Sequence, residues 1–135
     1  MIARTPAGIA RTVVVLLGAV ALAGCARTPQ AATSGDDWRV ELTTEPQTVM
    51  ALHRVVLRLR VTDRNGAALD ITDLTADADM PEMSHGKTRI SLRRTGVGAF
   101  EAGHTFSMDG RWEIHLGGRR EGRPFAAVVA LQVGR

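Results

Sequence analysis

The sequence predicts an all-β domain, an immunoglobulin-like β-sandwich of about seven strands that follows a cleaved signal peptide. Two observations lead to this fold class. Apolar and polar side chains alternate with a period of two over most of residues 38–133, and helical periodicity is almost absent. Turn signals rich in glycine separate the alternating runs at short spacings, which is typical of a sandwich.

The first three predicted strands each have one apolar and one wet face. Residues 38–43 and 55–62 carry apolar side chains at every second position. The turn sequence DRNG, at 63–66, then precedes a third run at 73–80, in which acidic residues alternate with aliphatic ones. One-sided alternation of this kind is expected of antiparallel strands that face water on one side.

The remaining strands are predicted from shorter runs. Ile90 and Leu92 mark a fourth strand, and residues 100–106 and 112–116 form the fifth and sixth. Residues 125–133 are nearly all apolar, which predicts a last strand that is covered on both faces.

The register between the fifth and sixth strands predicts their turn. A three-residue loop at 108–110 pairs Phe106 with Trp112 and His104 with Ile114, whereas a two-residue loop would mix the faces. The glycine that ends this loop can adopt the left-handed conformation that such loops use. The methionine that begins it is therefore expected beyond the paired strands.

The amino terminus is predicted to be a lipoprotein signal peptide, residues 1–24. Arg4 and Arg11 precede an apolar run that is too short to span a bilayer. The run ends in LAGC, which looks like a bacterial lipobox, in which the cysteine is acylated and the chain is cut before it. We expect Cys25 to anchor the mature protein to a bacterial membrane on its periplasmic side; an ordinary signal peptide with a chance cysteine is the alternative.

The mature chain is predicted to consist of a flexible tether, residues 25–37, and one domain, residues 38–135. Of the 17 lysines and arginines, two lie in the signal peptide, which leaves 15 against 14 acidic residues. Because the arginines are interleaved with acids and aliphatic residues, no nucleic-acid partner is expected. Cys25 is the only cysteine, so no disulfide forms within the chain.

The sequence offers no catalytic motif, and we do not expect an enzyme. Ser84 lies beside His85, but a nucleophile and its base need a defined hydrogen bond and an orienting third group, which sequence neighbours seldom supply. The chain has no tyrosine, no phosphate-binding glycine loop and no histidine pair with zinc spacing.

The stretch MPEMSHG, at 80–86, indicates a soft-metal site. If consecutive strands alternate in direction, this loop, the loop at 45–51 and the turn at Met108 lie at the same end, which gathers all four methionines of the mature chain. Thioethers select copper(I), and imidazole is a compatible partner. Met83 and His85 are two residues apart and so project to the same side of an extended loop.

We therefore expect one copper(I) ion to be bound by Met83, His85 and Met108, with Met80 as a fourth ligand. Met80 has the parity of the buried row and also suits core packing, and packing is likewise the alternative for Met108. An exposed loop methionine and a titrating surface histidine are the alternatives for Met83 and His85.

The other candidates have simple structural roles as alternatives. Met50 lies in a loop without a motif, and His53 shares the inward parity of the strand that follows it. His104 is expected to be a core histidine, and His115 is expected on the wet face near the far end. Glu82 is a hard ligand between two soft ones, so solvation explains it more simply.

The stretches MPEMSHG and GVGAFEAGHTFSMDGRWEIHL resemble the YtkA-like domain and its relatives in the FixH-like group, over about residues 38–133. The resemblance implies a small exported sandwich connected with copper handling or with assembly of a copper-containing respiratory oxidase. FixH-like proteins are usually held by a membrane helix, whereas this chain offers a lipobox. The family motif carries over to these positions: Met80, Met83, His85, Met108, Gly110 and Trp112.

Two functions from different classes follow from these observations. The first is a lipid-anchored extracytoplasmic protein that binds copper(I) and either holds it or passes it to a copper-protein partner. The second is a metal-free interaction module that assists assembly of a membrane or periplasmic complex, with its methionines as an adaptable contact surface.

Overall fold

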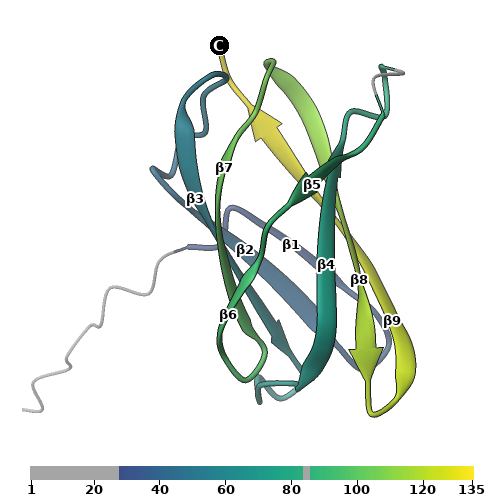
Figure 1. Ribbon diagram of the computed structural model, residues 1–135. Helices are drawn as coiled ribbons and strands as arrows, with labels where there is room; N and C mark the ends of the chain where they lie inside the picture. Colours follow the sequence, from purple (N-terminus) through teal and green to yellow (C-terminus); the bar gives the residue numbers. More distant parts are fainter. Residues whose placement is uncertain (1–27, 84–85) are drawn as a thin grey trace, which may run out of the picture.

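Alternating side chains build two antiparallel sheets that pack face to face, as Figure 1 shows for the computed structural model. The structure describes residues 28–83 and 86–135, and within them it contains nine strands and no helix. The prediction of an all-β sandwich is confirmed. The strands are β1 (Ala31–Ser34), β2 (Arg39–Glu45), β3 (Arg54–Thr62), β4 (Ile71–Asp79), β5 (Thr88–Ile90), β6 (Arg93–Gly96), β7 (Ala99–Thr105), β8 (Gly110–Arg120) and β9 (Arg123–Val133).

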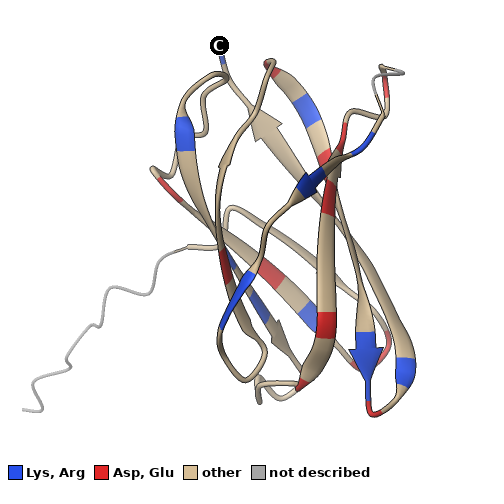
Figure 2. Cartoon of the chain, viewed as in Figure 1, with Lys and Arg blue, Asp and Glu red and all other residues tan. Residues whose placement is uncertain are grey.

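The strand order is β1-β2-β3-β7-β6 in one sheet and β5-β4-β8-β9 in the other. Apolar positions spaced two apart face inward from both sheets; in β3 they are Val55, Leu57, Leu59 and Val61, all buried. Full burial of each such side chain contributes about 1.5–3 kcal/mol. Charged residues of both signs lie along the strands, and ion pairs such as Arg58 with Glu101 join neighbouring strands on the outer face (Figure 2).

β9 departs from its prediction as a strand covered on both faces. Its residues alternate between buried and exposed along the whole strand, and Val128 is an exposed apolar side chain on the outer face. The prediction is wrong because the described residues form only two layers, so the outer face of each sheet, including that of β9, has no layer over it. Small residues, Ala126 and Ala130, occupy much of that outer face and so made the run look uniformly apolar.

The predicted fourth strand is two strands in different sheets. β5 pairs with β4, whereas β6 pairs with β7 in the other sheet. Only Ser91 and Leu92 separate them. A single extended segment therefore passes from one sheet to the other, and β5 and β6 run in the same direction.

β1 lies inside the range 25–37 for which the sequence predicts a flexible tether, and the prediction is wrong for residues 31–34. The strand pairs with β2, with Ala31 opposite Leu42, and the backbone N–H of Gln30 donates to the carbonyl of Leu42 at 2.7 Å. Backbone hydrogen bonds to an edge can order small polar residues that have little apolar surface. The signal peptide and Cys25 lie outside the described residues.

The predicted hairpin between residues 104 and 114 is also wrong. β7 pairs with β3 and β6, whereas β8 pairs with β4 and β9, so the chain crosses from one sheet to the other between Phe106 and Gly110. His104 is opposite Val55 and not opposite Ile114. Phe106 and Trp112 do meet, but across the core, with ring centroids 5.2 Å apart.

The predicted gathering of loops at one end agrees with the structure. The connection between β2 and β3, the connection between β4 and β5, and the crossing between β7 and β8 all lie at the upper end in Figure 1, together with the carboxyl terminus. The prediction holds despite the wrong strand count, because β5 and β6 run in the same direction and leave the parity unchanged. We call this end, formed by residues 46–53, 80–83, 86–87 and 106–109, the methionine pole.

Trp112 should be a large contributor to stability, because it is 6 % exposed and packs against Phe106. Trp112→Ala should lower the free energy of unfolding by about 3–5 kcal/mol, as expected for loss of a buried aromatic side chain. Val128→Ala, on the open face of β9, is the control and should cost within about 0.5 kcal/mol. Denaturant unfolding measures both, and equal small losses would contradict the core described here.

Candidate metal centre

Met80 brings its thioether to the start of β8. Its side chain is 7 % exposed and belongs to the hydrophobic core. A β-carbon placed on Gly110 would lie 2.8 Å from the terminal Cε methyl of Met80, and Gly110 also has a positive φ of 131°. Glycine at this position therefore serves twice: it allows the backbone conformation, and it leaves room for the methionine.

Met108 lies two residues before Gly110, in the crossing between the sheets. Its side chain is partly buried and packs against the core. Its backbone carbonyl accepts a hydrogen bond from the indole Nε1–H of Trp112 at 3.0 Å. Burial of Trp112 thus fixes the loop that carries Met108, and a buried indole N–H usually needs such a partner.

Met83 stands at the surface of the pole, with 41 % of its area exposed. Its backbone N–H donates to the carbonyl of Met80 at 3.0 Å, which closes a turn over Pro81 and Glu82, both exposed. The predicted ligand His85 lies outside the described residues.

Two of the four predicted ligands lie close to Gly110. Met80 follows β4 and fills the space over Gly110, and Met108 lies two residues before Gly110, which begins β8, the strand that pairs with β4. Met83 lies one turn after Met80. These donors are all thioethers, which select copper(I) over harder ions. The donor set therefore fits copper(I). Among residues 28–83 and 86–135, no group of three or more histidine, cysteine, aspartate or glutamate side chains could hold a metal ion.

Met50 belongs to the same pole and lies beside the end of β9, the strand that pairs with the start of β8. It forms a parallel bridge with Gly134, and a β-carbon on Gly134 would lie 3.1 Å from the sulfur of Met50. His53 is exposed, and its backbone N–H donates to the carbonyl of Met50 at 3.4 Å. The inward parity expected for His53 is wrong, because the turn before β3 directs it outward.

His104 faces inward as expected, and its ring meets Phe106 edge to face with centroids 4.7 Å apart. Partial burial lowers the pKa of His104 below the ordinary histidine value of 6.5, because desolvation disfavours the imidazolium. His104 thus adds a ring to the aromatic packing of Phe106 and Trp112.

His115 lies on the outer face as expected, but halfway along β8 and not near its far end. Its Nε2 atom is 3.5 Å from a carboxylate oxygen of Glu113 and makes no hydrogen bond within the described part of the chain. Its outward position separates it from the inward-facing methionines.

Sequence reasoning did not single out Leu52, a pole residue that is strongly exposed and has a positive φ of 64°. Nothing in the local sequence signals this, because leucine rarely adopts a left-handed conformation. The left-handed conformation of Leu52 is set by backbone hydrogen bonds to residues that are distant in sequence.

A comparison with models of protein families matches residues 33–117 to the family described as YtkA-like. A search of curated proteins found no match to the chain.

The lowered pKa of His104 should make the domain less stable in mild acid. Because the unfolded chain binds the proton at a higher pH than the folded one, stability falls as the pH drops through about 6.5 and levels off below the folded pKa. The free energy of unfolding should therefore decrease more between pH 7.5 and pH 5 in the wild type than in His104→Gln. Equal decreases would show that burial does not disfavour the charged ring.

Proposed function

The chain belongs to the YtkA-like family, and from that premise we propose that it is an exported, lipid-anchored protein that binds copper(I) at the methionine pole for copper handling or delivery. The observation that carries the proposal is the approach of Met80 to Gly110, two residues from Met108. Thioethers that flank two paired strands, β4 and β8, lie at one end of the domain. The only cysteine of the chain, Cys25, precedes that domain.

The proposed ligands are Met80, Met83 and Met108 with His85, which completes the set from the sequence. The methionines differ in access: Met80 is buried, whereas Met83 is exposed at the surface. A buried ligand retains the ion, and an exposed thioether can be exchanged for a ligand of a partner. This combination supports transfer of copper(I) to another protein over permanent storage.

The anchor is proposed at Cys25, on the evidence of LAGC at residues 22–25. No helix within the described residues is long and apolar enough to cross a membrane. The proposed location is the periplasmic side of a bacterial membrane.

A second function, a metal-free interaction module for a membrane or periplasmic complex, is favoured by the packing of two of the methionines. Met80 and Met108 both contact the hydrophobic core, which methionine fills well without any metal. The two proposals differ in one measurable property, retention of copper(I) by the purified mature chain.

The copper proposal predicts one tight site in an anaerobic titration against a competing chelator. The mature chain should carry Cys25→Ser, because a free thiol would itself bind copper(I). Met83→Ala with His85→Ala should weaken binding at least about tenfold, the loss that follows removal of even an outer-shell partner of a metal. Met108→Leu should also weaken it, because the substitution keeps the volume and removes the sulfur.

His115→Ala is the matched control and should bind as the wild type does, because its ring lies on the outer face of the sandwich. Affinity should also weaken below about pH 6, since an imidazole must be neutral to coordinate. If the double variant retains copper(I) as well as the wild type, or if the wild type retains none, the interaction-module function replaces the copper function.

A further inference from the structure

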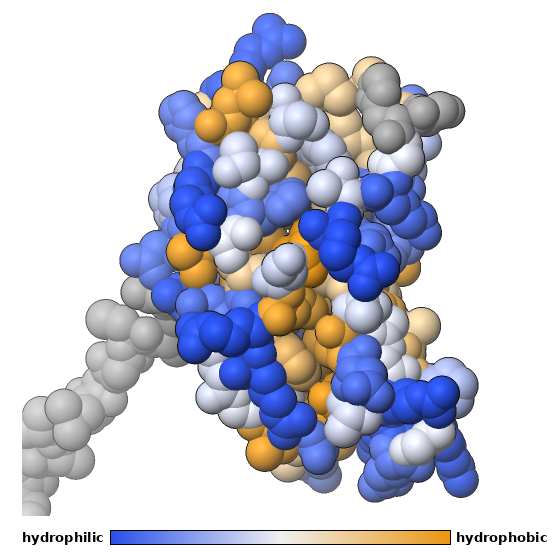
Figure 3. Space-filling view, in the orientation of Figure 1, coloured by the Kyte–Doolittle hydropathy of each residue, from blue (hydrophilic) through white to orange (hydrophobic). Residues whose placement is uncertain are grey.

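Leu52 is the most exposed of the large apolar side chains that the structure describes, at 74 %. It lies in the connection between β2 and β3, at the end of the molecule where Figure 3 shows apolar atoms at the surface. Its φ of 64° is a left-handed conformation that leucine rarely adopts. Exposure and strain at one residue are both unfavourable for an isolated domain, and such outliers cluster at functional sites.

The tip that carries Leu52 is held rigidly. The backbone N–H of Leu52 donates to the carbonyl of Phe106 at 2.8 Å, and the N–H of Ala51 donates to the carbonyl of Gly134, also at 2.8 Å. These bonds tie the tip to the crossing between the sheets and to the end of β9. The backbone that carries the exposed Leu52 side chain is therefore fixed in position.

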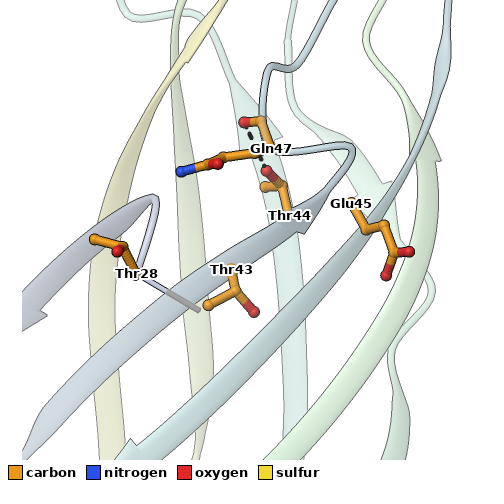
Figure 4. Close-up of a pocket in the computed structure, with 5 residues that line it drawn as sticks. All are labelled: Thr28, Thr43, Thr44, Glu45 and Gln47. Carbon is orange, nitrogen blue, oxygen red and sulfur yellow. Dashed lines mark hydrogen bonds between the residues drawn. The ribbon is translucent and has the colours of Figure 1, made fainter. Parts of the chain in front are cut away.

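The described chain begins close to the start of the same connection. Figure 4 shows Thr28 beside Thr43 in a small pocket, where the hydroxyl of Thr44 donates to the carbonyl of Gln47 at 3.1 Å. Cys25 precedes Thr28 by three residues, so its Cα can lie no further than about 11 Å from that of Thr28. Since β1 orders residues 31–34, the segment between the lipid and the domain is much shorter than a 13-residue tether over 25–37 would be.

A short anchor beside the start of the connection between β2 and β3 limits which surface can meet the bilayer. We propose that the methionine pole faces the membrane that holds the lipid of Cys25, and that Leu52 enters the interface of that bilayer. This inference rests on the lipid anchor of the proposed function. In this orientation the exposed Met83 faces the membrane surface.

The charge next to Leu52 suits this orientation. Arg54 begins β3, where Figure 2 shows positive charge, and it is exposed. It makes no ion pair with any residue that the structure describes. The guanidinium of Arg54 lies over Gly103 of β7. An apolar tip beside this exposed arginine is suited to a phospholipid interface, with the leucine among the acyl chains and the positive charge near the phosphates.

The test uses the full lipidated chain in vesicles of phosphatidylethanolamine and phosphatidylglycerol. Leu52→Cys, labelled with an environment-sensitive fluorophore, is compared with Val97→Cys, the matched control. Val97 is also apolar and 55 % exposed, but it lies between β6 and β7 at the opposite end of the sandwich. An acylated Cys25 does not react with the label, so each variant carries a single probe.

The proposal predicts a blue-shifted emission at position 52, strongly quenched by nitroxide-labelled lipid, and an aqueous, unquenched emission at position 97. Flotation of the vesicles with the wild type, and its loss in Cys25→Ser, tests the anchor separately. If the wild type does not float, the anchor and this orientation both fail, while the copper titration stands on its own.

If the protein floats but position 52 is aqueous, the orientation alone is overturned. A blue shift at position 52 that is insensitive to the lipid nitroxides would overturn it as well. That result would assign Leu52 to a protein contact, and dependence on protein density in the vesicle would identify that contact as a second copy of the chain.

Discussion

The crossing of the chain between the sheets, from Phe106 to Gly110, is the constraint on which the methionine pole depends. Phe106 is fully buried, packs against Trp112 and accepts a hydrogen bond from the N–H of Leu52. Trp112 in turn donates to the carbonyl of Met108. Gly110 ends the crossing and leaves the space that the Met80 side chain fills. Through these few residues one crossing holds three loops from two sheets in fixed positions.

The same constraint explains how the proposed site can hold its soft ligands in place without a cysteine. Methionine side chains are flexible, so a defined site needs the backbone around them to be rigid. Met108 is held through its carbonyl and Met80 through its contact at Gly110. The side chain of Met83, by contrast, is exposed at the surface. The proposed site therefore combines a preorganised interior with one accessible donor, which suits an ion that is held and then released.

The sequence predicted the sandwich because alternation reports directly which side chains face the core, as in β3. It could not predict the crossing at 106–110, because a glycine-containing turn between two alternating runs has the same local pattern whether the strands pair or change sheets. β1 was missed for a related reason: its small polar residues have no periodicity, and β2 supplies their order. Chain parity predicted that Met80 and Met108 lie at the same end of the domain, but the strained conformation of Leu52 depends on neighbours that are distant in sequence.

X-ray absorption at the copper K-edge of the copper(I)-loaded mature chain, with Cys25→Ser, tests the central claim most directly. Ligation by Met80, Met83 and Met108 predicts a first shell that contains more than one sulfur, and the sulfur contribution should decrease in Met108→Leu. A coordinated His85 would add the outer-shell scattering of an imidazole ring. A first shell of nitrogen and oxygen alone, or one that is unchanged in Met108→Leu, would contradict a copper centre at the methionine pole.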